Sequence, residues 1–379
     1  MARLVFTVNN VDFLRSHRAV LVTGARAAGY DVHVVGPAGP GVSWLESLGV
    51  PFHEWSLDRK GQHPVMEAKT VATLVQRYLH LKPDLVHHVT IKPVLYGSTA
   101  ARVARVKGVV NAVSGLGYLF LSSGMRATAR RLGIAAAYRA ALNTPNSRVI
   151  LQNDDDEAEL QRLHALGSAH VVKIRGSGVD LKHFAPSPLP VGAPLIVLPA
   201  RLLRDKGVVE FVEAAQRLKP DFPTARFALI GGIDEGNPAA VTRAEVEGWV
   251  RAGAVEWWGH QADIAAVYRQ ATIVCLPSYR EGLSRALIEA AAMGRAIVTT
   301  DAPGCRDAVD FGRCGVLVRV RDSASLADGL RTVLADPALA QRLGDGAARF
   351  AGENFSQDNV LARHLQLYDE LIHRPPNSL

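Results

Sequence analysis

Short apolar runs alternate with longer amphipathic segments along this sequence. Leu4–Val8 is a candidate buried strand, an amphipathic stretch follows from about Ser16 to Ala28, and Gly29 separates it from the apolar run at 30–35. Strands that alternate with helices of about 10–15 residues are typical of βαβ units, which build a parallel sheet. The opening of the chain therefore predicts an α/β fold.

The alternation occurs twice. The first series runs to about residue 151, and residues 176–194 then hold four prolines and three glycines, a composition typical of a linker. A second series begins at Leu195, and 379 residues exceed one ordinary domain. We predict two doubly wound parallel-sheet domains at 1–178 and 195–357, a linker at 179–194, and a C-terminal helix and tail at 358–379. A cleft between such domains would face the carboxyl ends of both sheets.

Composition excludes several classes of protein. With 48% apolar and 21% charged residues the chain can bury real cores and is not expected to be disordered. Its cysteines, Cys275, Cys305 and Cys314, form no CxxC pair and no even set, which fits a reducing cytoplasm better than a disulfide scaffold or a structural zinc site. The N-terminal residues lack the apolar core of a signal peptide, and no run is long enough to predict a membrane span.

Glu281 and Glu289 belong to the segment with the clearest chemistry. The predicted strand 273–277 ends in a loop at 278–284, and a helix is predicted at 285–293. Glu281 would thus lie at the carboxyl end of a parallel strand, where open α/β sheets bind ligands. Gly282 would let the backbone approach a ligand. The amides of Leu283 and Ser284 would lie at the start of the helix and form an anion site there. Glu289 would lie up to roughly 12 Å further along the helix axis.

Arg201 and Lys206 supply the complementary charge. They leave the first predicted strand of the second domain, so they would reach the same edge of the sheet as Glu281. Cations at this edge can neutralise a diphosphate as it leaves. The glutamate pair and the two cations are each common when found alone. The simple alternative to a binding site is that Glu281 and Glu289 are two solvated glutamates on a helix surface. Together the four residues predict a site for an extended ligand with hydroxyls at both ends and a diphosphate in the middle.

The runs EGLSRALIEAAAMGRAIVTTDAPGCRDAV and ARLLRDKG resemble the retaining family 4 glycosyltransferases of GT-B fold. SHRAVLVTGARAAGYDVHVV, TIKPVLYGSTAARVARVKG and GSGVDLKHF extend the resemblance over nearly the whole chain, toward the bacterial transferases that add N-acetylgalactosamine to undecaprenyl-diphosphate-linked sugars.

The resemblance implies roles for single residues. Glu281 would hold donor-sugar hydroxyls, Glu289 the ribose, and Arg201 with Lys206 the diphosphate of a UDP-sugar. The amides of Gly282, Leu283 and Ser284 would support the distal phosphate. The turns at Gly231–Gly232 and Gly259–Gln261, which include His260, would frame the nucleobase and ribose. The acceptor would be a lipid-linked saccharide.

The first domain departs from the family pattern. Many relatives carry a glycine pair in the first βα loop and a histidine after the strand near Val113, whereas this chain has Val8–Asp12 and Ser114–Gly115 there. The resemblance therefore leaves open which residue of this domain contacts the sugar. The candidates at the predicted sheet edge are Asn10, Arg18, Thr90, Lys92 and Ser114.

Other signals favour no cofactor or metal. Asp154–Asp156 contains a D-x-D pattern, but it follows a strand and precedes Glu157, so it predicts an acidic helix start. No GxGxxG follows the first strand, which argues against a nicotinamide enzyme. A UDP-sugar 2-epimerase, or a non-catalytic sugar-nucleotide-binding subunit, remains an alternative function for such a two-domain chain.

The first half of the chain is basic. Residues 1–180 hold 21 Lys/Arg against 13 Asp/Glu, while residues 181–379 hold 22 against 23. The apolar segment Leu116–Met125 precedes Arg126, Arg130, Arg131 and Arg139 on a predicted helix, a pattern suited to an anionic membrane surface. A core helix with a basic outer face is the alternative. We expect a cytoplasmic protein, peripheral on the inner face of a bacterial plasma membrane, with no nucleic-acid partner.

Overall fold

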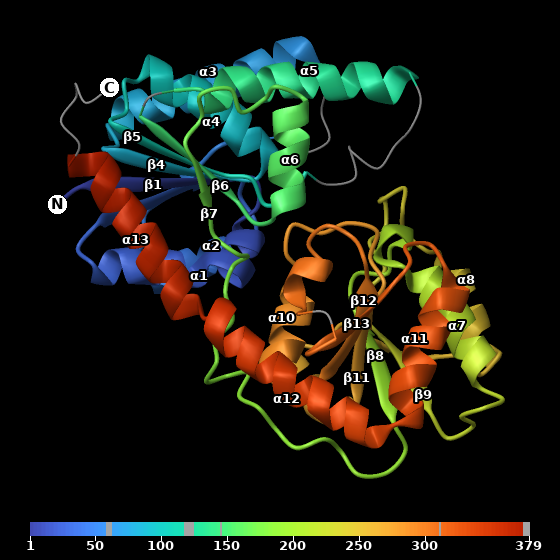
Figure 1. Cartoon of the computed structure of the whole chain (residues 1–379). Coiled ribbons are helices and arrows are strands. Elements are labelled where there is room, and N and C mark those ends of the chain that lie inside the picture. The colour runs from blue at the N-terminus through green and yellow to red at the C-terminus, as the bar shows by residue number, and fades with distance from the viewer. Residues whose placement is uncertain (58–62, 117–124, 145, 311, 374–379) are drawn as a thin grey trace. The chain divides into compact units, whose positions relative to one another are not determined.

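The computed structural model describes residues 1–57, 63–116, 125–144, 146–310 and 312–373, and for residues 64 and 125–130 it describes the backbone alone. Contacts divide the chain into two compact units (Figure 1). Met1–Ser177 and Asp358–Leu379 form the first unit, and Gly178–Gln357 form the second.

The first unit contains a seven-stranded sheet in the order β3-β2-β1-β4-β5-β6-β7, and all its pairings are parallel. Its strands are β1 (Arg3–Val8), β2 (Asp31–Gly36), β3 (Phe52–Glu54), β4 (Leu85–Val89), β5 (Gly108–Ala112), β6 (Ser147–Leu151) and β7 (Val171–Lys173). Its helices are α1 (Val11–Ala27), α2 (Val42–Ser47), α3 (Pro64–Leu81), α4 (Ile91–Val103), α5 (Met125–Leu142), α6 (Asp154–Arg162) and α13 (Gln357–His373).

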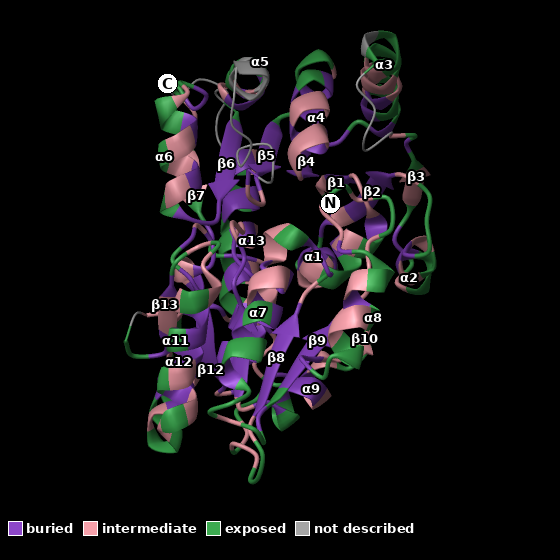
Figure 2. Cartoon of the chain, turned by 90° about the vertical axis from the view of Figure 1, so that its right-hand side faces the viewer, coloured by how far each residue is buried: buried purple, intermediate pink, exposed green. Residues whose placement is uncertain are grey.

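Helices cover both faces of this sheet. Helices α1, α2 and α13 share an apolar core with one face, and α3 to α6 pack on the other (Figure 1). The five inner strands are almost wholly buried, whereas the edge strands β3 and β7 and the outer faces of the helices are more exposed, as Figure 2 shows. A sheet covered on both faces favours strands that are largely apolar, and β1 is such a nearly continuous apolar run.

The last helix, α13, belongs to the first unit although it ends the chain. Its Leu361 side chain lies so close to Gly24 of α1 that a Cβ at position 24 would come within 2.4 Å of it. Its Tyr368 hydroxyl lies 2.6 Å from Nδ1 of His87, a buried residue of β4. The sequence predicted this helix but gave no sign of which domain it would cover.

The second unit contains a six-stranded parallel sheet in the order β10-β9-β8-β11-β12-β13. Its strands are β8 (Leu195–Pro199), β9 (Arg226–Ile230), β10 (Glu256–Gly259), β11 (Ile273–Leu276), β12 (Ala296–Thr300) and β13 (Gly315–Val318). Its helices are α7 (Val208–Leu218), α8 (Arg243–Arg251), α9 (Ile264–Gln270), α10 (Arg285–Ala292), α11 (Ser323–Ala335) and α12 (Pro337–Asn354). Helices α7, α8 and α11 pack on one face, and α9 and α10 on the other.

Residues 179–194, the expected linker, lie with the second unit by their contacts. Val179 and Phe184 are buried in its core, and Val179 forms a parallel β-bridge with Ser356. Gly178 lies in the left-handed region with φ 73°, and a Cβ there would come within 2.6 Å of the Gln357 Cα. The two places where the chain passes from one unit to the other are thus held side by side.

Most predicted elements occur within a few residues of their expected bounds, with two notable differences. The first helix begins at Val11 rather than near Ser16, because the Asn10 side chain accepts a hydrogen bond from the Phe13 amide and caps it. The edge strand Val171–Lys173 was not predicted, since three residues are too short a run to show a period.

Candidate functional site

The carboxyl edge of the second sheet brings Lys206 and Glu281 together. Strands β8 and β11 are neighbours, and the strand order reverses between them, which is the position where doubly wound sheets bind ligands. Lys206 ends a single 3₁₀ turn after β8, and Glu281 lies in the loop after β11. The Lys206 Nζ lies 2.5 Å from Glu281 Oε1, and the two side chains are 19% and 16% exposed. This ion pair is partly shielded yet still reachable by a ligand.

Backbone contacts hold the two loops of this pair against each other. The Tyr279 amide and the Ser278 hydroxyl both donate to the Asp205 carbonyl, at 2.9 and 3.1 Å. Gly207 has φ 72°, and a Cβ there would lie 2.2 Å from the Pro277 carbonyl oxygen. Only glycine permits this approach, so the glycine after Lys206 sets the distance between the loops.

The loop from Glu281 to Ser284 is also fixed from its other side. The Glu281 amide donates to the Pro303 carbonyl at 2.8 Å, and the Ser284 amide donates to the Gly304 carbonyl at 3.2 Å. A Cβ at Gly304, where φ is 73°, would come within 2.4 Å of the Glu281 carbonyl. The carboxylate of Glu281 is therefore carried on a backbone anchored at both ends.

These contacts qualify the anion site expected at Gly282, Leu283 and Ser284. The Ser284 amide is already bonded to Gly304, and the Ser284 hydroxyl accepts from the Leu287 amide at 3.4 Å as the N-cap of α10. A phosphate would have to displace the Gly304 carbonyl to reach the Ser284 amide. The start of α10 still presents its positive dipole end beside Glu281.

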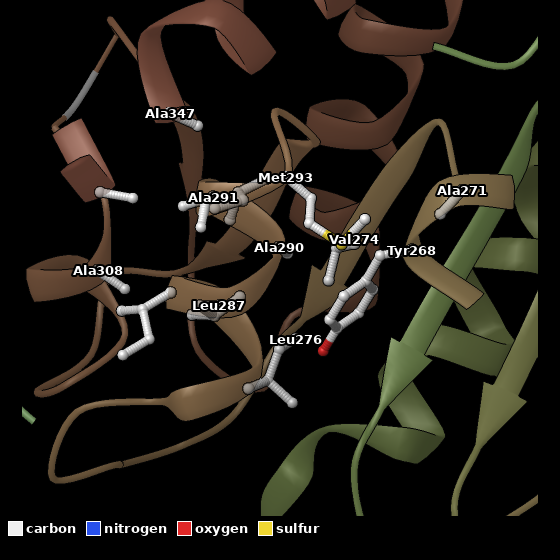
Figure 3. Close-up of a cluster of buried hydrophobic side chains, with 14 of the residues drawn as sticks. Tyr268, Ala271, Val274, Leu276, Leu287, Ala290, Ala291, Met293, Ala308 and Ala347 are labelled. Atoms are coloured by element: carbon white, nitrogen blue, oxygen red, sulfur yellow. The ribbon is translucent and has the colours of Figure 1, made fainter. Parts of the chain in front are cut away.

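Apolar packing seats α10 on the sheet. Leu287, Ala290 and Ala291 of this helix face Val274 and Leu276 of β11, as Figure 3 shows. Small side chains on the helix let it lie close to the strand, which fixes the direction in which its other face points. The helix start at Ser284 and the carboxylate of Glu289 are positioned by this contact.

Glu289 is buried, with only 5% of its surface exposed. It pairs with Arg285 one turn earlier on α10. Burial raises the pKa of the Glu289 carboxyl above its usual value, and the charge of Arg285, with a smaller effect from His183, opposes that rise. A buried carboxylate with a single cationic partner keeps acceptor capacity for a further donor, such as a hydroxyl pair.

Arg201 does not contact the Lys206–Glu281 pair. It leaves β8 in the same loop as Lys206, but its Nη1 lies 2.6 Å from Asp234 Oδ2, in the loop after β9, and its side chain is 61% exposed. The structure therefore places Arg201 and Lys206 in one loop with separate partners.

The glycine turns after β9 and β10 are joined to the loop after β8. The Gly231 amide donates to the Gly259 carbonyl at 2.8 Å, and the Leu202 amide donates to the Gly232 carbonyl at 3.0 Å. Gly231 has φ 152°, and a Cβ there would lie 2.0 Å from the Ala200 carbonyl oxygen. His260 follows as an exposed residue. Three neighbouring loops thus form one continuous edge.

Sequence reasoning missed the residues that orient the Glu281 loop. The Tyr279 hydroxyl donates to Glu210 of α7 at 2.5 Å, and the Arg321 guanidinium lies 4.6 Å from the centroid of the Tyr279 ring. Burial, together with Glu210, raises the pKa of the Tyr279 hydroxyl well above its usual value, so it stays a donor. Burial and then the charge of Glu281 raise the pKa of the Cys305 thiol to about 12. The one signal in the sequence that could have indicated this network is the position of Tyr279, two residues before Glu281.

The five candidates of the first unit occupy different surroundings. Asn10 caps α1, and Ser114 accepts a hydrogen bond from the buried Arg18 at 3.4 Å. Arg18 also donates to the Gly176 carbonyl at 3.3 Å, and burial lowers the pKa of its guanidinium to about 10. Lys92 Nζ lies 2.9 Å from Glu67 Oε1 of α3. Thr90, between β4 and α4, has the positive φ of 76°.

Asp154–Asp156 begin α6, as predicted, with Asn153 as the N-cap. Asp154 and Glu157 both pair with Lys173 of β7. His87 and His88 are fully buried and hydrogen-bonded to Tyr368 and Asn111 respectively, so both serve the core of the first unit. The D-x-D pattern thus has a local structural explanation.

The expected membrane segment lies mostly outside the described residues. This applies to residues 117–124 and to the side chains of Met125, Arg126 and Arg130. Arg131 and Arg139 lie on α5, and Arg139 donates to the His164 carbonyl at 3.0 Å. Within the described part of the chain, no helix is both long and apolar enough to cross a membrane.

Two family models match the chain. Residues 4–153 match "Glycosyl transferase 4-like", and residues 193–336 match "Glycosyl transferases group 1". The chain is also 28% identical over 355 residues to the N,N'-diacetylbacillosaminyl-diphospho-undecaprenol alpha-1,3-N-acetylgalactosaminyltransferase of Campylobacter jejuni, covering 90% of this chain and 92% of the relative. The second family match contains the whole Lys206–Glu281 edge.

Solved glycosyltransferases share the fold. A glycosyltransferase from Rickettsia africae superposes with a TM-score of 0.80 at 17% identity, covering 99% of both chains. Anabaena HepE in complex with UDP and glucose superposes with a TM-score of 0.74 at 19% identity, covering 97% of this chain and 100% of that one. At these identities the likeness establishes the architecture of two parallel-sheet domains, the GT-B fold.

Proposed function

Since the chain belongs to the family 4 glycosyltransferases of GT-B fold, we propose that it moves a hexose or N-acetylhexosamine from a UDP-sugar to an undecaprenyl-diphosphate-linked saccharide, with retention of configuration. N-acetylgalactosamine is the preferred sugar. Similarity over 90% of the chain to the Campylobacter enzyme, whose name gives that sugar and a diphospho-undecaprenol acceptor, supports this choice.

The observation that carries the proposal is the Lys206–Glu281 pair at the switch point of the second sheet. In the transfer, the bond between the anomeric carbon and the diphosphate oxygen breaks, and negative charge grows on the leaving UDP. The Lys206 ammonium, held in place before the reaction by Glu281, stabilises that charge without having to reorganise. Glu281 at the same time accepts hydrogen bonds from hydroxyls of the donor sugar.

Glu289 and Arg201 complete the donor site in this proposal. The buried carboxylate of Glu289 accepts from the ribose hydroxyls, and Arg285 opposes the rise in the Glu289 pKa that burial causes. Arg201 turns from Asp234 to the diphosphate. The turns at Gly232 and His260 frame the nucleobase and ribose, and the amides of Gly282 and Leu283, in the loop before α10, face the distal phosphate.

The proposed reaction uses no metal and no cofactor. Lys206 and Arg201 supply the positive charge that a metal would otherwise bring to the diphosphate. In retaining enzymes of this family no protein carboxylate need act as the nucleophile, and an oxygen of the leaving phosphate takes the proton of the acceptor hydroxyl. We assign the same course to this chain.

The lipid-linked acceptor implies that the reaction occurs at a membrane. We propose that the protein works on the cytoplasmic face of a bacterial plasma membrane, held peripherally through the basic first unit. Arg131 and Arg139 on α5, with Arg126 and Arg130, would meet anionic lipid.

The test is a panel of UDP- and GDP-sugars, each offered with diphosphoundecaprenyl-linked saccharides, followed by anomeric assignment of the product by NMR. We expect transfer from a UDP-sugar, with UDP-N-acetylgalactosamine best, and an α-linked product. An inverted product, or a GDP-sugar as the preferred donor, contradicts the proposal. Turnover of a UDP-sugar without any acceptor would favour the epimerase alternative, and UDP binding without turnover a non-catalytic subunit.

A further inference from the structure

Strand β10 contains two neighbouring tryptophans whose indoles have different partners. The Trp257 indole N–H donates to the Gly231 carbonyl, in the loop after β9, at 2.9 Å. The Trp258 indole N–H donates to the Glu256 carboxylate of its own strand at 2.8 Å. The Trp257 side chain therefore holds the glycine turn that frames the nucleotide in the proposed function, and the Trp258 side chain does not.

The Trp257 ring is held in place by the protein itself. It packs against the apolar core that α7, α8 and α11 share with the sheet, and the Arg243 guanidinium lies over the ring at 5.4 Å from its centroid. Strand β10 also departs from a regular ladder here, because Trp257 is opposite Leu229 while Gly259, two residues later, is opposite Ile230. A bulge of this kind redirects the side chains beside it and often lies next to a functional site.

The Gly231 backbone is fixed from three directions. Its amide donates to the Gly259 carbonyl at 2.8 Å, its carbonyl accepts from Trp257, and a Cβ on it would come within 2.0 Å of the Ala200 carbonyl oxygen. A trans peptide unit is planar, with its C=O and its N–H on opposite sides. The bond from Trp257 to the Gly231 carbonyl therefore also sets the direction of the Gly232 N–H, which points away from the indole.

The Gly232 N–H is available to a ligand. No acceptor bonds to it within the part of the chain that the structure describes. Gly232 is partly exposed, and a Cβ there would meet no atom within 4 Å. Its carbonyl, in contrast, accepts from the Leu202 amide at 3.0 Å. The turn thus presents an N–H donor whose orientation Trp257 fixes.

We propose that Trp257 is a positioning residue for the nucleotide: its indole holds the Gly231 carbonyl so that the Gly232 N–H donates to an oxygen of the nucleoside part of the sugar donor. The inference rests on the proposed function, in which this turn frames the nucleobase and ribose. A donor that is oriented before binding needs no further ordering when the ligand arrives. Trp257 therefore acts on the binding of the nucleotide, and not on the transfer step that the Lys206–Glu281 pair serves.

The first experiment measures UDP affinity by calorimetry in matched tryptophan variants. Trp257→Phe should weaken UDP binding about fivefold, the loss typical of one hydrogen bond between neutral groups. Trp258→Phe is the matched control, because it also loses an indole N–H and a ring beneath an arginine, and it should bind UDP like the wild type. Wild-type affinity in Trp257→Phe, or an equal loss in both variants, overturns the inference.

A second replacement separates the N–H from the packing of the ring. The benzothiophene analogue of tryptophan keeps the shape of the side chain and has sulfur in place of the N–H. At position 257 it should weaken UDP as Trp257→Phe does, with the fold retained by circular dichroism. Wild-type affinity would assign the effect of Trp257→Phe to lost packing and reject the role of the N–H.

Comparison of UMP with UDP tests which part of the nucleotide is bound. Both should lose affinity by the same factor in Trp257→Phe, because the nucleoside is common to them. A loss confined to UDP would place the Gly232 N–H at the distal phosphate, against the inference.

Kinetics gives a readout that a purely structural role would not move. Trp257→Phe should raise the KM for the UDP-sugar by the factor seen for UDP, with kcat at saturating donor unchanged. A lower kcat at unchanged KM would place Trp257 in the transfer step and contradict the inference. If no saccharide is ever glycosylated, the proposed transfer fails, while UDP binding and its loss in Trp257→Phe are still measurable. Transfer with an unaffected KM in Trp257→Phe rejects only the role of Trp257.

Discussion

Both sheets reverse their strand order once, and each reversal lies beside a lysine–glutamate pair. In the second unit Lys206 and Glu281 are 2.5 Å apart, and in the first Lys92 and Glu67 are 2.9 Å apart. Their exposures are similar, 19% and 16% against 20% and 21%. The pairs differ in the elements that hold their side chains. Lys206 and Glu281 both lie in loops that follow the two switch-point strands, whereas Glu67 lies on helix α3.

The support behind the two pairs also differs. In the second unit, hydrogen bonds from Tyr279, Glu281 and Ser284 fix the loop on both sides. In the first, the residue at the strand end, Thr90, is strained and its hydroxyl has no partner. A site that stabilises growing charge gains from being rigid before the reaction. The following changes test that contrast.

Lys206→Ala should have the largest effect. Loss of one positioned stabiliser of developing charge typically costs about 2.7–4 kcal/mol, so kcat should fall by at least about 100-fold. Steady-state kinetics measures kcat, and circular dichroism confirms that the variant is folded. Lys219→Ala is the control, because that lysine is exposed at the end of α7 and donates to the Ala225 carbonyl at 3.5 Å. Near-normal kinetics in folded Lys206→Ala would remove the second switch point from the mechanism.

Glu281→Gln and Glu289→Gln should differ in kind. The first should lower turnover by about 10- to 150-fold and relax the choice of sugar, the range expected for hydrogen bonds to a charged group. The second should mainly weaken free UDP, because its partner is the ribose. Calorimetry with UDP separates them, with Glu247→Gln on the exposed face of α8 as the control. Equal loss of UDP affinity in both variants would contradict the assignment.

The charge contrast between the two halves of the chain predicts a smaller, salt-dependent effect. Each basic residue near an anionic leaflet contributes about 1 kcal/mol, decaying over a Debye length. Replacing Arg126, Arg130 and Arg131 by glutamate should release the protein from anionic liposomes and slow transfer to a long-chain acceptor, but not to a short water-soluble one. Flotation with liposomes at low salt measures the release. Equal binding by the triple variant would leave these arginines as a solvated helix face.

Excess EDTA should have no effect on transfer. Arg201 and Lys206 bring the charge that a metal would supply, whereas Asp154–Asp156 start α6 and Asp154 pairs with Lys173. The protein is first dialysed against the chelator, and the initial rate is then measured with and without EDTA. A rate abolished by EDTA and restored by Mn²⁺ or Mg²⁺ would reopen Asp154 and Asp156 as metal ligands.

The periodicity of the sequence determined the fold class and the order of its elements. A short continuous apolar run such as Leu195–Pro199 is typical of a strand buried on both faces, which favours a parallel sheet. The same logic put Glu281 and Lys206 at strand ends, and the structure brings them into contact. Their common edge could be predicted because every βα loop of a parallel sheet opens on the same edge, whereas the pairing of β8 with β11 belongs to the tertiary structure.

Contacts between distant parts of the chain decided the rest. No local pattern indicated that α13 covers the first unit, that Arg201 pairs with Asp234, or that the Ser284 amide is bonded to Gly304. Nor did it distinguish Asn10, which caps a helix, from Thr90, which is strained and unpaired. Each of these facts depends on which segment packs beside another, a free-energy difference summed over the whole tertiary structure and absent from any local pattern.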